Sequence, residues 1–147
     1  MTDVVQADFP HIHQENVRYG DTDRQGHVNN AVFSTFFECS RTRILYDGSR
    51  GLITPDRELV IVKIEMEFLA ELTWPGMVEI GSRIAKFGRS SIIFEQAIFQ
   101  HGKYASVSTN VMVMIDAATR KSAPLPETVV EAFADLVAAP MSIKTNS

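Results

Sequence analysis

The chain has 147 residues and a mass of 16.4 kDa, the size of one domain, so a single domain over residues 1–147 is expected. Its 45% hydrophobic and 22% charged residues are typical of a globular protein and exclude disordered, collagen-like and coiled-coil chains. A net charge of −4 argues against nucleic acid as a partner, because phosphate backbones normally require a basic face.

Residues 1–10 contain no lysine or arginine and no long apolar run, so no signal peptide is expected. We expect flexible ends around an ordered core of about residues 10–139. The longest apolar run, residues 111–115, is far too short to span a membrane. Cys39 is the single cysteine and cannot form an internal disulfide, which together with these features predicts a cytoplasmic protein.

Five strands are predicted. A polar strand covers residues 12–19, and the clearest strand covers residues 59–72, where an apolar row alternates with a mostly charged row. In that strand Val60, Val62 and Ile64 are expected on the apolar face. Three more strands, near residues 78–85, 92–101 and 104–115, are joined by short turns, which predicts an antiparallel sheet.

Two helices are predicted. The first begins near Asn29 or Asn30, which favour N-caps, and ends at Tyr46 or Asp47 before Gly48. The second begins at Pro126 and ends before Pro140. An antiparallel sheet with one apolar helix must wrap around that helix to bury both, so the fold class is α+β.

Residues 19–30, between the first strand and the first helix, form the densest polar cluster in the chain. Asp21 and Asp23 supply carboxylates, and the start of the helix supplies unpaired N–H groups. A carboxylate beside such donors is what acyl transfer requires. The alternative is that both aspartates only bind backbone donors of the loop.

The pattern YGDTDxxGHVNN at residues 19–30, followed by FFExxR at residues 36–41, resembles the signature of acyl-CoA thioesterases of the 4-hydroxybenzoyl-CoA thioesterase type. This resemblance implies the hotdog fold, in which an antiparallel sheet of about five strands wraps around a long central helix. The predicted order of elements agrees with that fold from about residue 12 to residue 138, with a short C-terminal helix in addition.

The resemblance also implies roles for single residues. Asp23 would be the catalytic nucleophile or general base, and the backbone N–H of Asn30 would hold the thioester oxygen. His27 could orient Asp23 or contact substrate, but we favour a role in holding the loop. Glu38 could face the acyl group, or it could form an i,i+3 pair with Arg41 on the helix.

Coenzyme A phosphates would bind at the turn between the third and fourth strands, which carries Lys86, Arg89, Ser90 and Ser91. The implied enzyme hydrolyses an acyl- or aryl-CoA thioester without a cofactor. It would be a homodimer or a dimer of dimers, with its active site at the subunit interface. Five apolar side chains could line the acyl pocket or simply pack in the core: Phe33, Phe37, Met66, Met112 and Met114.

The alternative function is a non-catalytic hotdog module that binds acyl-CoA or acyl carrier protein, which would not need Asp23. No metal site is predicted: His11 and His13 share one face of a strand, but a zinc site needs three or four ligands.

Overall fold

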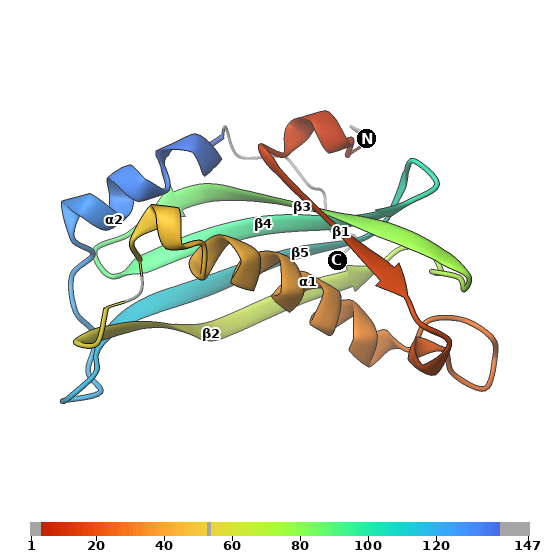
Figure 1. Ribbon diagram of the computed structural model, residues 1–147, viewed down its shortest axis with the longest axis horizontal. Helices are drawn as coiled ribbons and strands as arrows, with labels where there is room; N and C mark the ends of the chain where they lie inside the picture. Colours follow the sequence, from red (N-terminus) through yellow and green to blue (C-terminus); the bar gives the residue numbers. More distant parts are fainter. Residues whose placement is uncertain (1–3, 53, 139–147) are drawn as a thin grey trace.

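The computed structural model describes residues 4–52 and 54–138 and shows an antiparallel sheet with a helix across one face (Figure 1). Most of the two ends predicted to be flexible, and Pro140 at the predicted end of the second helix, lie outside the described residues. The main elements are β1 (His11–Val17), α1 (Asn30–Leu45), β2 (Arg57–Phe68), β3 (Gly76–Phe87), β4 (Ser91–Gln100), β5 (Lys103–Asp116) and α2 (Glu127–Ala132). Short 3-10 helices are η1 (Gln6–Asp8), η2 (Tyr19–Asp21), η3 (Gly48–Arg50) and η4 (Ala134–Leu136).

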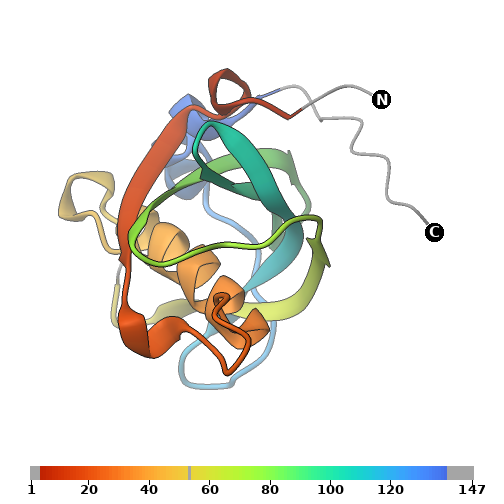
Figure 2. The same ribbon diagram turned by 90° about the vertical axis from the view of Figure 1, so that its right-hand side faces the viewer.

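The five strands form one sheet in the order β1-β3-β4-β5-β2, and every pair of neighbours is antiparallel. The predicted strands and their short turns are therefore confirmed. β4 is at the centre and is almost wholly buried, whereas β1 and β2 are the two edges. The sheet curves around α1 when the molecule is viewed from the end where α1 begins (Figure 2).

β2 differs from its prediction in two ways. It ends at Phe68 rather than at residue 72, because the N–H groups of Leu69 and Ala70 both donate to the carbonyl of Ala105 and the regular ladder stops. A β-bulge between Ile61 and Lys63 inserts one unpaired residue. Since side chains alternate with a period of two, the bulge puts Val60 and Ile64, which lie opposite Val113 and Asn110, on different faces of the sheet, so the predicted apolar row of Val60, Val62 and Ile64 is wrong.

α1 has the predicted limits. Asn29 is its N-cap, and the side chain of Asn29 accepts a hydrogen bond of 2.9 Å from the Ala31 N–H. The 16 residues of α1 span about 24 Å at 1.5 Å per residue. The 14 residues of β5 span about 47 Å at 3.4 Å per residue. The expected long central helix is thus a helix of ordinary length that covers only part of the sheet.

The core between α1 and the sheet falls into two apolar clusters. One surrounds Phe33 and Phe37 near the start of α1, and the other surrounds Ile44 near its end and includes residues of α2. A third cluster lies on the opposite face of the sheet, where Val4 and Phe9 cover Phe99. The segment before β1 therefore packs on the sheet.

A buried polar layer separates the two clusters under α1. Ser40 bonds to Ser82 at 2.8 Å, and Arg41 donates to Gln96 at 3.1 Å. Gln96 also accepts from Asn110 at 3.0 Å, so the layer connects α1 to three central strands. Burial lowers the pKa of the Arg41 guanidinium.

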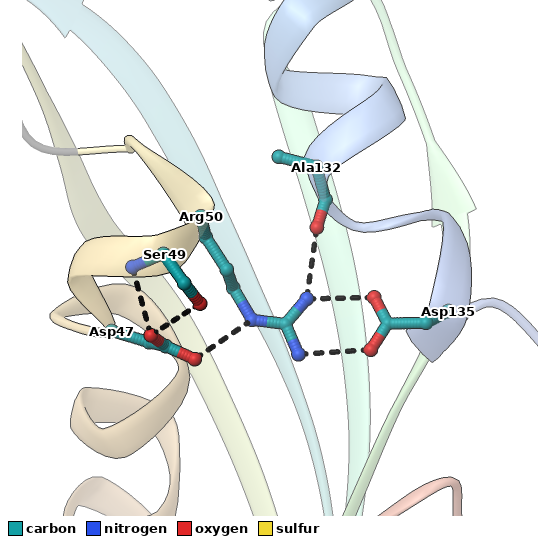
Figure 3. A network of polar contacts seen from close by, with 5 residues as sticks. All are labelled: Asp47, Ser49, Arg50, Ala132 and Asp135. Atoms are coloured by element: carbon teal, nitrogen blue, oxygen red, sulfur yellow. Dashed lines mark hydrogen bonds and ion pairs between the residues drawn. The ribbon is translucent and has the colours of Figure 1, made fainter.

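The end of α1 is fixed to the C-terminal helices by Arg50 (Figure 3). Its guanidinium donates to both carboxylate oxygens of Asp135, at 2.7 and 2.9 Å, and to the carbonyl of Ala132 at 2.8 Å. Asp47 lies 3.8 Å away on its other side. α2 ends at Ala132, earlier than predicted, and η4 continues the chain along the sheet.

Candidate active site

The loop between β1 and α1 is held by Asp21, which is only 2% exposed. Its carboxylate accepts hydrogen bonds from the Arg18 backbone N–H at 2.8 Å and from the Arg18 guanidinium at 2.9 and 3.2 Å. Burial alone would raise the pKa of Asp21, but the bonds from Arg18 outweigh it and lower the pKa. The carbonyl of Asp21 also accepts from Asn29 at 2.9 Å. These bonds show that Asp21 braces the loop.

Asp23 occupies the exposed tip of the same loop. Its Oδ1 accepts from the backbone N–H groups of Gln25 at 2.9 Å and His27 at 3.4 Å. The turn closes through Gly26, whose φ of 87° is in the left-handed region that favours glycine. No described residue donates a hydrogen bond to Oδ2, so one carboxylate oxygen is fixed and the other is available.

Asn30 is the first residue of α1, where backbone N–H groups have no acceptor within the helix. The Ala31 N–H is bound by the Asn29 side chain and the Val32 N–H by the Asn29 carbonyl. Among the described residues, none accepts a hydrogen bond from the Asn30 N–H. This donor therefore lies free at the positive end of the helix dipole.

A cavity of about 320 Å³ brings Asp23, His27 and Asn30 together. It is also lined by residues 68–71, which are the end of β2 and the segment after it, and by Phe33. The rings of Phe33 and Phe68 are in edge contact, with 5.1 Å between their centroids. The side chains of His27 and Glu71 face each other across the cavity wall, with Nε2 and Oε2 2.9 Å apart. Sequence reasoning did not identify Glu71.

Glu38 and Arg41 are not part of this cavity. Glu38 is exposed on α1, and the predicted pair with Arg41 is not formed, because Arg41 turns inward and binds Gln96. Arg41 is 6% exposed. The FFExxR pattern therefore includes one residue of the buried polar layer, and that residue stabilises the packing of α1 on the sheet.

The four residues of the predicted phosphate site lie far from Asp23 in the same chain. The loop of Asp23 is joined to the start of β3, where the Val28 N–H bonds to the Leu72 carbonyl at 2.9 Å. Lys86 and the turn of Arg89, Ser90 and Ser91 lie at the other end of β3, 12 residues and roughly 35–40 Å along the strand. Within one chain, the predicted catalytic loop of Asp23 and the predicted phosphate-binding turn of Arg89 are therefore far apart.

The five candidate lining residues separate in the structure. Only Phe33 contributes to the cavity of Asp23, while Phe37 and Met112 are buried in the core and Met66 packs beside it. Met114 lines a second cavity of about 320 Å³ at the opposite end of α1. Simple core packing, the alternative considered above, accounts for most of them.

His11 and His13, the two histidines on one face of β1, do not form a metal site in the described part of the chain. His13 bonds to Glu15 at 2.8 Å, and no three His, Cys, Asp or Glu side chains of residues 4–52 and 54–138 meet as metal ligands would. No helix in these residues is long and apolar enough to cross a membrane.

Comparisons with known proteins agree on one family. The model of the thioesterase-like superfamily matches residues 17–133. The acyl-CoA thioester hydrolase YbgC of Escherichia coli O6:H1 is 28% identical over 121 residues, which are 80% of this chain and 90% of that protein.

Solved structures share the arrangement of elements. A thioesterase of Thermus thermophilus, solved as a complex with coenzyme A and Zn, is 30% identical, with a TM-score of 0.77 over 90% of this chain and 98% of that one. A protein of Pseudomonas aeruginosa PAO1 has a TM-score of 0.84 over 95% of this chain and 100% of that one, at 23% identity.

Proposed function

Because the chain belongs to the thioesterase-like superfamily, we propose that it is a hotdog-fold thioester hydrolase that converts an acyl-CoA or aryl-CoA into a free acid and coenzyme A. The observation that carries this proposal is the open cavity that is lined both by Asp23, whose Oδ2 has no donor among the described residues, and by Asn30, the first residue of a helix with a free N–H. A nucleophile and a group that can bind the carbonyl oxygen thus line the same space.

The chemistry of thioesters suits this small set of groups. The Asn30 N–H would donate a hydrogen bond to the carbonyl oxygen as negative charge develops there, and removal of one such donor typically costs about 10²–10³ in rate. Asp23 would attack the carbonyl carbon or activate a water. The leaving thiolate needs little help from an acid, because thiols have a pKa of about 8.5.

We further propose that the functional unit is a homodimer formed through β2. Within residues 4–52 and 54–138, no strand pairs with the outer side of this edge strand. It exposes apolar side chains along and just beyond its length: Ile61, Val62, Ile64, Phe68 and Leu69 are 38–59% exposed. An exposed, apolar edge of this kind is normally covered by another chain. A second copy of β2 would pair with it across a two-fold axis.

Antiparallel pairing of two β2 strands would also complete the site. The Phe68 end of β2 borders the cavity of Asp23. The Arg57 end of β2 pairs with the part of β5 that contains Met114. The Met114 N–H donates to the carbonyl of Ser90 at 2.8 Å, so this end of β2 is near the Arg89 turn. In a two-fold pair the Arg57 end of one strand lies beside the Phe68 end of the other. The partner's Arg89 turn would therefore approach Asp23 and could bind the coenzyme A phosphates.

The proposed substrate is a small acyl or aryl thioester of coenzyme A, acted on in the cytoplasm by a single-domain chain without a cofactor. An aromatic acyl group of the 4-hydroxybenzoyl kind is supported by the motif of residues 19–30 and by Phe33 and Phe68 at the cavity. A free Cys39 suits the reducing cytoplasm.

The test is the release of free thiol from a panel of acyl-CoAs, short to long aliphatic and aromatic, by the wild type and by Asp23→Asn. We expect turnover by the wild type and a fall of about 10²-fold or more in the variant at an unchanged melting temperature. Turnover that survives in Asp23→Asn would overturn the role of Asp23. If no acyl-CoA is hydrolysed but several raise the melting temperature, the chain is the binding module instead.

A further inference from the structure

His27 and Glu71 are two titratable groups in the cavity that the proposed function does not yet use. Glu71 is the one that sequence analysis did not identify. It follows β2 and lies in the wall opposite the loop of Asp23, and its carboxylate is 2.9 Å from Nε2 of His27. The backbone fixes both partners, since residue 27 forms an isolated bridge with Thr73 and the Val28 N–H bonds to the Leu72 carbonyl. The backbone of both segments is therefore held in place, while the His27 and Glu71 side chains themselves are 36% and 67% exposed.

The contact with Glu71 favours one position for the proton of His27. An ionised carboxylate 2.9 Å from Nε2 attracts a proton on that nitrogen and would repel a lone pair there, so the proton is favoured on Nε2. In a neutral imidazole the other nitrogen, Nδ1, is then the acceptor. Glu71 thus leaves His27 with a lone pair on Nδ1 that can remove a proton from water.

The cavity contains two separate groups that can act on the acyl carbon. Asp23 has one oxygen without a donor and lines the cavity together with Asn30, and the His27–Glu71 pair lines the same space of about 320 Å³. A nucleophile that forms a covalent intermediate needs a second group to activate the water that releases it. The two groups match the two halves of such a reaction.

We propose that Glu71 is a positioning residue that orients His27 as the general base of the second half-reaction; this rests on the proposed hydrolysis. In the first half, Oδ2 of Asp23 attacks the thioester carbon, the C–S bond breaks and coenzyme A leaves as a thiolate. In the second half, Nδ1 of His27 takes a proton from water while the water oxygen attacks the acyl carbon of the anhydride. The bond from that carbon to Asp23 breaks, the carboxylate of Asp23 is regenerated and the imidazolium returns its proton to solvent.

The experiment is rapid mixing of the wild type, Glu71→Gln and His27→Gln with the best acyl-CoA of the panel, with thiol release followed from the first turnover. Since only the second half-reaction depends on the pair, both variants should release about one thiol per active site at close to the wild-type rate. Steady turnover should then fall by about 10-fold or more in Glu71→Gln and further in His27→Gln. A purely structural role of Glu71 would not produce this burst.

The control is Glu131→Gln, which removes the same charge from the exposed side of α2, beside the apolar cluster at the C-terminal end of α1. It should keep wild-type kinetics. Glu71→Gln with wild-type turnover, or slow turnover in both variants without a burst, would overturn the inference while leaving the hydrolase intact. A wild type that releases no thiol from any acyl-CoA would instead refute the proposed function.

Discussion

The two ends of α1 are built on opposite principles. Each has a cavity of about 320 Å³ beside it. At the C-terminal end, the guanidinium of Arg50 binds two carboxylate oxygens and a carbonyl, and its side chain is 14% exposed. At the N-terminal end, the loop exposes Asp23 and, within the described chain, leaves the Asn30 N–H without an acceptor. At the C-terminal end the strongest polar contacts are made within the chain, although Nε of Arg50 has no hydrogen-bond partner among the described residues. At the N-terminal end a carboxylate oxygen and an N–H stay available for a ligand.

This contrast separates stability from activity along a single helix. A polar group that is paired in the folded chain contributes to stability, and its removal leaves its partner unpaired. A polar group that is held in place but unpaired contributes little to folding and can bind a transition state at no cost of reorganisation. The buried layer around Arg41 lies between the two ends and separates their apolar clusters.

The largest expected effect is at the N-terminal end, in Asn30→Pro. Proline suits the first position of a helix, and the extended backbone of Asn29, with ψ of 139°, accepts a following proline. The substitution therefore deletes the N–H donor and little else. We expect a fall in kcat of about 10²–10³ with the melting temperature kept.

Asn30→Ala is the matched control, since it removes the side chain but keeps the N–H, and should keep most of the activity. Equal losses in both variants would show that the side chain, and not the backbone donor, is what matters at this position.

At the C-terminal end, Arg50→Met should have the opposite effect: it should lower the stability of the chain and leave kcat unchanged. It removes three charge-assisted hydrogen bonds that join the end of α1 to α2 and η4. We expect the free energy of unfolding to fall by about 2 kcal/mol, with the exposure of Asp135 already discounted, and the melting temperature by about 4–8 °C. Denaturant unfolding and steady-state kinetics together test it, because kcat per folded chain should not change. A large loss of kcat would mean that the two ends are coupled.

A smaller effect is expected for Asn29→Ala. Asn29 lies at the N-terminal end of α1, but its side chain is paired within the chain and therefore contributes to stability. The Asn29 side chain caps α1 through a bond of 2.9 Å to the Ala31 N–H. Its loss should cost about 1 kcal/mol of stability, measured by denaturant unfolding. Asn29→Ser retains the cap and should behave as the wild type, and a destabilised Ser variant would argue against capping.

The smallest effect concerns pH. The hydrogen bond from Arg50 holds the pKa of Asp135 below its ordinary value. The stabilisation is therefore complete above the ordinary carboxyl pKa of about 3.9 and is lost as the pH falls through the lowered value. Unfolding of the wild type and Asp135→Asn from pH 7 to pH 2 should show a difference that is constant above about pH 5 and shrinks below it. A difference that grows in acid would contradict this sign.

The sequence predicted most of this fold because its patterns are local. The apolar patterns and short turns that predict β2 to β5, and the cap at Asn29, are properties of a few neighbouring residues, and these strands and the cap appear in the structure. The bulge in β2 and the early end at Phe68 depend on how β2 meets β5, which one strand's sequence does not contain. The limits of α1 were predicted correctly, but α1 was expected to be a long central helix and it covers only part of the length of the sheet.

The candidate site divides in the same way. Asp23, His27 and Asn30 lie within eight residues of one motif, and the structure places them around one cavity. Glu71 was missed because in the sequence it is one more charged residue in an alternating row, and only the fold brings it to His27. A pair of Arg41 with Glu38, one turn earlier on the helix surface, was one of two alternatives from the sequence, but Arg41 is buried and binds Gln96 instead.

The separation of the Asp23 loop and the Arg89 turn at opposite ends of β3 has a genetic consequence. If each complete site takes Asp23 from one subunit and Arg89 from the other, a chain that lacks Asp23 and a chain that lacks Arg89 are each defective as homodimers. After the two are unfolded and refolded together, random pairing makes half of the dimers mixed, and each mixed dimer has one intact site, about a quarter of all sites. Two defective alleles of this protein would then complement each other in one cell.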